Sequence, residues 1–189
     1  MNPLACIKLL FTEDRMRGNP SDVHPAILQT FFFLVLPLSF LPPAMLLYAG
    51  HFHPAAFLID VPFARWVDVA IAFFVTELLT VPLIAWVIRD LAGMLRIEND
   101  YRQAFLVAGM TPVPLWISST ALAVPNLAFL IVAVASGLLL SALLLYRAVR
   151  AVFAITNEED AQALSSSAFS VGGLAWAILC GIVVLPLIG

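Results

Sequence analysis

Hydrophobic residues along the chain are grouped into five stretches, each about as long as a helix that crosses a membrane. A bilayer has a hydrocarbon core of about 30 Å, so a crossing helix needs roughly 20 apolar residues. Lipid offers the backbone no hydrogen-bond partner, and a helix satisfies its own groups. We therefore predict an all-α bundle of five transmembrane helices in one membrane domain, 26–189. The expected spans lie at about 26–49, 66–88, 103–124, 127–146 and 168–188.

The shortest join between two spans is Val124-Pro125-Asn126. Proline disfavours the helical conformation in the residue before it, and asparagine is common in turns. The third and fourth spans are therefore expected to form a tight antiparallel hairpin.

Basic residues are distributed very unevenly between the two sides of the membrane that alternating spans define. Cytoplasmic loops are rich in Lys and Arg. Arg65 stands alone on one side. The other eight basic residues lie on the opposite side: Lys8, Arg15, Arg17, Arg89, Arg96, Arg102, Arg147 and Arg150. We predict a cytoplasmic N-terminus and a C-terminus outside, with residues 1–25 as a cytoplasmic segment that includes a helix at the membrane interface.

Composition agrees with a membrane protein and excludes several other classes. Hydrophobic residues make up 62% of the 189 residues and charged residues 11%, against about 45–50% and 25% in soluble domains.

A net charge of −3 gives no basic surface for nucleic acid. His51, His53 and Asp60 are residue types that bind metals, but these three do not have the number and spacing of ligands that a stable zinc site needs. We expect no metal and no cofactor. No catalytic triad or phosphate-binding loop appears, so a non-enzymatic protein is expected.

Glu77 lies at the centre of the second span, where an ionisable side chain costs several kcal/mol unless it is neutralised or paired. Thr80 lies one turn further on the same face, and Pro82 lacks an N–H group, so a kink is expected there. Thr111 and Pro112 lie at the same depth in the third span. These five residues form a predicted polar layer at the membrane midplane. In transporters, such layers line binding sites between interrupted helices.

Three interpretations of Glu77 stay open. Because no Lys, Arg or His lies in any span, the carboxyl is expected to be neutral and to donate a hydrogen bond that joins helices. Alternatively, it is the proton or cation site of a small permease. In the third interpretation, it faces a partner protein.

Small residues recur every fourth position in the last two spans, as they do where helices pack closely in membranes. The two sets are Ala133, Gly137 and Ser141, and Gly173, Ala177 and Gly181. They predict packing within the bundle or, alternatively, contact with a second copy or another membrane protein. Arg147 and Arg150 follow the fourth span and are candidates for binding anionic lipid head groups at the inner leaflet.

Several short motifs, taken in order, resemble the bacterial branch of the Yip family, the Ypt/Rab-interacting five-span membrane proteins. They are Tyr101-Arg102-Gln103-Ala104-Phe105, Thr111-Pro112, Val124-Pro125, Leu144-Leu145-Tyr146 and Asn157-Glu158-Glu159-Asp160. The resemblance implies a cytoplasmic N-terminus and five helices. Eukaryotic relatives act in vesicle trafficking with prenylated small GTPases. The chain lacks the Asp-Leu-Tyr-Gly-Pro motif of that branch, so GTPase binding is not carried over.

Together these observations predict a non-enzymatic scaffold or interaction protein for membrane partners or lipid. Its expected location is the bacterial inner membrane. Its expected partners are membrane lipid and another membrane protein or a second copy of the chain. The alternative is a small permease or ion-coupled carrier that uses the polar layer around Glu77.

Overall fold

A computed structural model describes residues 28–54, 61–98 and 100–188, and these ranges contain helices and no strand. Five helical segments are long and apolar enough to cross a membrane, which confirms the predicted all-α bundle of five spans. They are Leu28–Phe52, Phe63–Met94, Tyr101–Ala123, Leu127–Val152 and Glu158–Ile182. The expected interfacial segment 1–25 and Asp60 lie outside the described residues.

Two of the spans are broken into shorter helices, and prolines lie at the breaks. The first contains the π-helical turn η3 (Phe31–Val35), α3 (Leu36–Ser39) and α4 (Leu41–Phe52). The third contains α6 (Tyr101–Met110), α7 (Val113–Ser118) and the 3₁₀ turn η5 (Ser119–Ala123). Proline at Pro37, Pro42 and Pro112 removes a backbone donor and crowds the preceding turn, which disfavours a continuous helix.

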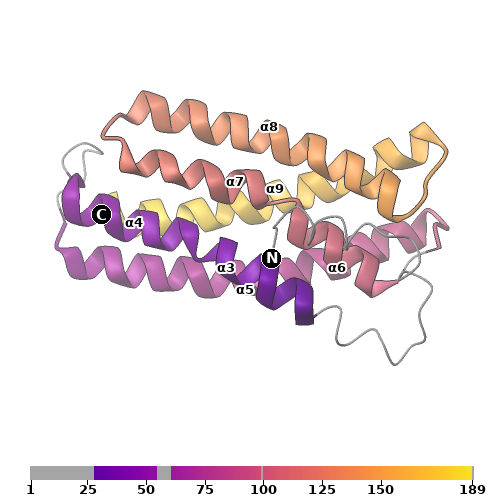
Figure 1. Cartoon of the computed structure of the whole chain (residues 1–189), viewed down its shortest axis with the longest axis horizontal. Helices are drawn as coiled ribbons and strands as arrows, with labels where there is room; N and C mark the ends of the chain where they lie inside the picture. The colour runs from indigo at the N-terminus through magenta and orange to yellow at the C-terminus, as the bar shows by residue number, and fades with distance from the viewer. Residues whose placement is uncertain (1–27, 55–60, 99, 189) are drawn as a thin grey trace, which may run out of the picture.

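The other three spans are continuous helices: α5 (Phe63–Met94), α8 (Leu127–Val152) and α9 (Glu158–Ile188). Helix α5 continues through Pro82. Figure 1 shows the helices running along the long axis of the molecule, with α8 along one edge, α4 and α5 along the other, and α9 between them. Helix α5 packs against α9, α6 and α4, and α7 packs against α8.

The hairpin between the third and fourth spans forms as the sequence predicts. Val124 is extended, with φ −98° and ψ 121°, and ends the helical turn before it. Asn126 begins α8, and its side-chain oxygen accepts a hydrogen bond of 3.0 Å from the backbone N–H of Phe129. This side-chain cap satisfies one of the free donors at the start of the helix.

Buried apolar side chains form two clusters along the bundle. The larger includes Val35, Val81, Ala85, Ile88, Phe105, Val107, Trp116, Leu145, Val149, Leu164 and Ala168. The smaller consists of Leu46, Trp66, Val69, Ala70, Phe73 and Leu179. On α5, Glu77 lies between Phe73 of the smaller cluster and Val81 of the larger one. The carboxyl is therefore placed where the two clusters meet.

Candidate functional site: a pocket at Glu77

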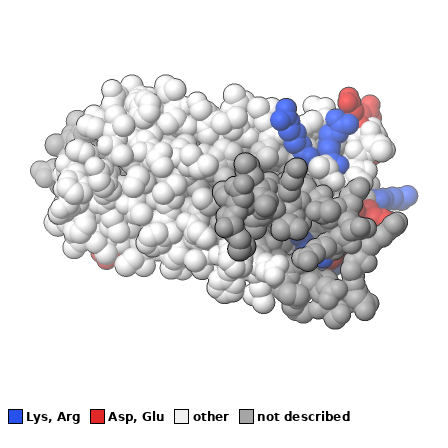
Figure 2. All heavy atoms as spheres, viewed as in Figure 1, with Lys and Arg blue, Asp and Glu red and all other residues white. Residues whose placement is uncertain are grey.

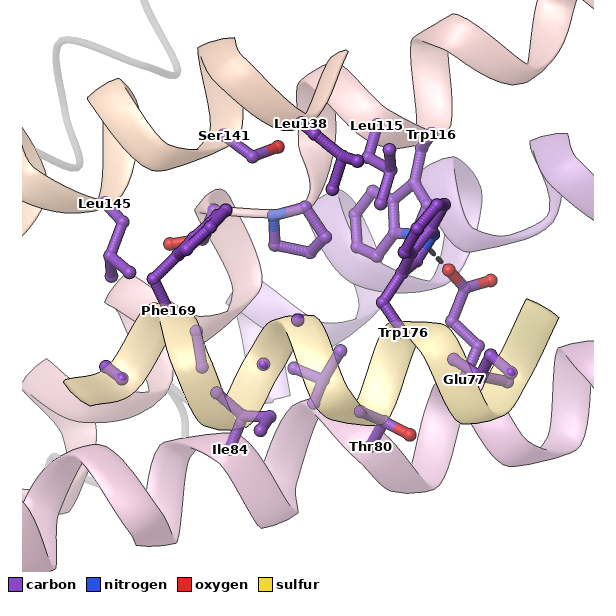
Figure 3. A pocket seen from close by; sticks show the side chains of 18 of the residues that line it. Glu77, Thr80, Ile84, Leu115, Trp116, Leu138, Ser141, Leu145, Phe169 and Trp176 are labelled. Atoms are coloured by element: carbon purple, nitrogen blue, oxygen red, sulfur yellow. Dashed lines mark hydrogen bonds between the residues drawn. The ribbon is translucent and has the colours of Figure 1, made fainter. Parts of the chain in front are cut away.

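A pocket of about 110 Å³ lies among α5, α6, α7, α8 and α9, with Glu77 in its wall (Figure 3). Four of its 19 lining residues carry a polar side chain other than tryptophan: Glu77, Thr80, Thr111 and Ser141. The remaining walls are aliphatic, aromatic, glycine or proline. Such a composition, with a few convergent polar groups in an apolar cavity, is typical of small-molecule sites.

The Glu77 side chain is 8% exposed and is held by Trp116, which is 1% exposed. The indole Nε1–H of Trp116 donates a hydrogen bond to Oε1 of Glu77 (Figure 3). The other oxygen, Oε2, is buried and has no hydrogen-bond partner among the described residues. Half of the carboxyl is therefore satisfied by the protein and half is left for another group.

The predicted polar layer is brought together in part. Thr80 and Thr111 line the pocket, and Pro112 lies beside them. The hydroxyl of Thr80 donates to the Thr76 carbonyl at 2.8 Å. The hydroxyl of Thr111 donates to a carbonyl of its own helix at 2.7 Å. Both hydroxyl protons are thus engaged within their helices, as is common for threonine in membrane helices.

Pro82 does not line the pocket among the residues that the structure describes there. Its carbonyl accepts a hydrogen bond of 3.3 Å from the phenolic hydroxyl of Tyr101, which begins α6. The proline therefore contributes to the contact between α5 and α6.

In the small-residue set of α8, Gly137 faces α7. Gly137 is buried, and a Cβ atom there would lie 2.9 Å from Oγ of Ser118 and 3.2 Å from the carbonyl oxygen of Pro114. Ala133, one turn earlier, is partly buried. Ser141, one turn later, is 4% exposed, lines the pocket, and its Oγ has no hydrogen-bond partner in the described structure.

The small-residue set of α9 is placed differently. A Cβ atom at Gly173 or Gly181 would meet no heavy atom within 4 Å, and Ala177 is exposed. Gly173 and its neighbour Gly172 line the pocket and do not form a close contact between helices. The same spacing thus marks a close helix approach on α8 and open space on α9.

Three aromatic side chains in the pocket wall were not singled out from the sequence: Trp116, Phe169 and Trp176. Figure 3 shows Trp116 and Trp176 beside Glu77. The sequence could have marked Trp116 as part of the polar layer, because tryptophan is a hydrogen-bond donor and this one lies in the span that carries Thr111 and Pro112. Phe169 and Trp176 lie in the predicted span 168–188, which contains no charged residue to draw attention to them.

Charged side chains gather at one end of the bundle, which we call the charged end (Figure 2). Its members are Arg89, Asp90, Arg96, Glu98, Asp100, Arg102, Arg147, Arg150, Glu158, Glu159 and Asp160. They belong to the end of α5, the start of α6 and the join between α8 and α9. The other charged residues in the described ranges are Arg65, Asp68 and Glu77.

At the charged end, Arg150 is held by two neighbours and Arg147 is exposed. The Arg150 guanidinium lies 3.6 Å from the Glu158 carboxylate. Its Cζ atom lies 5.8 Å from the centre of the Tyr146 ring. An ion pair this exposed contributes little to stability, so its main effect is to fix the direction of the guanidinium.

Five apolar spans with a charged end define a multi-pass integral membrane protein. The Yip1 domain family matches residues 11–179, which is most of the chain, and the protein therefore belongs to the Yip family. Neither the curated proteins nor the solved structures contain a match to this chain.

Proposed function

We propose that this Yip-family protein acts without catalysis, as a scaffold that binds membrane partners or lipid through its charged end. The supporting observation is that eleven of the fourteen described charged residues lie at that end, while the rest of the bundle is apolar enough to be enclosed by lipid. The excess of Lys and Arg on this side supports a cytoplasmic orientation in a bacterial inner membrane. In this orientation we infer that Arg147 and Arg150 attract anionic head groups at the inner leaflet.

A photo-crosslinking residue at Glu159 of the charged end is expected to give discrete adducts in native membranes. The same residue at Phe63, which begins α5 at the other end, is expected to give none of these adducts. Both side chains are exposed, so access is matched. Adducts that contain phospholipid should decrease when Arg147 and Arg150 are both replaced by Gln, because each basic residue near an anionic surface contributes about 1 kcal/mol. Identical adducts from both ends would contradict the proposal.

A second candidate function is a proton- or cation-coupled carrier, and the position of Glu77 favours it. The carboxyl lies near the middle of α5, in the wall of a pocket, with one oxygen unpartnered in the described structure. Intramembrane carboxyl groups in such positions mark ion and proton pathways in many transporters.

For the carrier function, Glu77→Gln is expected to abolish proton flux in proteoliposomes that carry a pH-sensitive dye. Glutamine keeps the size of the side chain and an oxygen that accepts from Trp116, but it cannot exchange a proton. Asp68→Asn is the matched control, because Asp68 lies on the same helix and is exposed. Equal flux in the Glu77→Gln variant and the unmodified protein would exclude a carrier mechanism that depends on this carboxyl.

A further inference from the structure

The enclosed part of the pocket is smaller than a cavity that holds a whole aromatic ring. Its volume is about 110 Å³, and an engineered apolar cavity of about 150 Å³ is known to bind benzene. A phospholipid chain or a large multi-ring compound would exceed this space. The enclosed space therefore takes a small head group, and a ring attached to that group has to extend toward the opening of the pocket.

The walls favour an aromatic ring. Trp116, Phe169 and Trp176 come from two helices and line the space together with aliphatic residues of α5 and α8 (Figure 3). Aromatic rings pair with one another in stacked or edge-to-face arrangements that contribute beyond the area they bury. Faces of tryptophan also attract cations.

The polar groups favour a cation. Glu77 is the one acidic lining residue, and no Lys, Arg or His is among the lining residues that the structure describes. Oε2 of Glu77 and Oγ of Ser141 are both buried and without a partner in the described part of the chain. A buried oxygen without a hydrogen bond costs free energy, and an ammonium group can donate up to three hydrogen bonds while it supplies the missing positive charge.

The pocket also reaches the membrane-facing surface between α8 and α9. Leu138, Gly172, Gly173 and Trp176 line it and are partly exposed. Added Cβ atoms at Gly172 and Gly173 would meet nothing within 4 Å. A lipophilic ligand dissolved in the bilayer therefore has a route of entry beside these two glycines.

We propose that the pocket binds a lipophilic ammonium cation that carries one aromatic ring, with the ammonium at Glu77 and the ring against Trp176 at the opening between α8 and α9. Phenethylamine in its protonated form is the simplest member of this class. The inference deepens the carrier function by naming the class of its substrate. It is tested as equilibrium binding without any gradient, so absence of transport would not count against it.

The test is binding of radiolabelled phenethylamine to the purified full chain in detergent, with tryptophan fluorescence as a second readout. Gly173→Leu places a side chain into the pocket and is expected to weaken binding at least about tenfold, because the ligand loses its space. Gly181→Leu is the matched control: it lies on the same helix, its Cβ also meets nothing within 4 Å, and it does not line the pocket. Its affinity should stay within about twofold of the unmodified protein.

Charge recognition is tested separately from ring binding. Glu77→Gln should weaken phenethylamine binding by roughly tenfold or more, because the cation loses its counter-charge in a poorly solvated site. 2-Phenylethanol has the same ring and a neutral hydroxyl, and it should bind the unmodified protein much more weakly than phenethylamine. Equal affinity for the two compounds would overturn the proposed cation, and equal binding by Gly173→Leu and Gly181→Leu would overturn the proposed site. The ligand comparison uses the unmodified protein and does not depend on any variant folding.

Discussion

Replacing Trp116 with alanine is expected to lower the free energy of unfolding by about 3–5 kcal/mol, the cost typical of truncating a buried tryptophan. The ring is 1% exposed, so its loss leaves a cavity beside the pocket. The indole N–H is also the described donor to the Glu77 carboxyl, and its loss leaves both carboxyl oxygens unsatisfied. Unfolding in mixed detergent and SDS micelles, followed by circular dichroism, measures the effect.

Two further variants separate the ring of Trp116 from its hydrogen bond. Trp116→Phe keeps an aromatic ring and removes the donor, so it should cost about 1–3 kcal/mol, the penalty of an unsatisfied buried group. Adding Glu77→Leu to Trp116→Phe should recover much of that loss, because removal of both polar partners leaves none unsatisfied. Trp86→Ala is the control on α5, since Trp86 is 56% exposed and should change stability by about 0.5 kcal/mol or less. If Trp116→Phe were as stable as the unmodified protein, the hydrogen bond would not stabilise the fold.

The second large effect is expected at Gly50, near the end of α4. A Cβ atom at this position would overlap the Trp66 indole, with Cε3 at 2.9 Å and the Cγ and Cδ2 atoms closer still. Trp66 is 2% exposed and belongs to the smaller core cluster, so its ring has no space into which it can move. Gly50→Ala should therefore destabilise the protein by about 1–3 kcal/mol through overpacking, and Gly50→Leu by more.

The control for Gly50 is Gly93→Ala in α5, where an added Cβ atom meets nothing within 4 Å. Alanine has a higher helix propensity than glycine, by up to about 1 kcal/mol in a helix interior, so this variant should be unchanged or slightly more stable. The same detergent unfolding experiment compares the two. Equal stability of Gly50→Ala and Gly93→Ala would mean that α4 and α5 separate more easily than the packing of Trp66 indicates.

The five spans could be predicted because the bilayer imposes a length and a composition that local sequence records directly. The hairpin at Val124-Pro125-Asn126 could also be predicted, because its backbone conformation depends on three adjacent residues. The polar partner of Glu77 could not be predicted from the sequence. The absence of Lys, Arg and His from the predicted spans indicated that the Glu77 carboxyl donates a hydrogen bond between helices. In the structure the carboxyl accepts one instead, from the neutral indole N–H of Trp116 on α7.

The break before α7 explains much of this difference. The break at Thr111 and Pro112 interrupts the third span, so positions after it cannot be assigned to a face by counting 100° per residue from Thr111. The small-residue sets give a second example. Gly137 touches α7 while Gly173 faces open space, although both belong to the same spacing pattern. The difference depends on which neighbour covers each helix, and that information is absent from the helix's own sequence.

Helices α5 and α9 are longer than the membrane requires. The 32 residues of α5 extend about 48 Å at 1.5 Å per residue, against a hydrocarbon core of about 30 Å. Each is one unbroken helix that contributes residues to the charged end and has pocket residues near its middle. Residues of the charged end and of the pocket wall therefore belong to the same continuous helices, and in α5 Pro82 lies between Glu77 and the charged end. Contacts made at the charged end therefore act on the same two helices that carry Glu77 and Trp176.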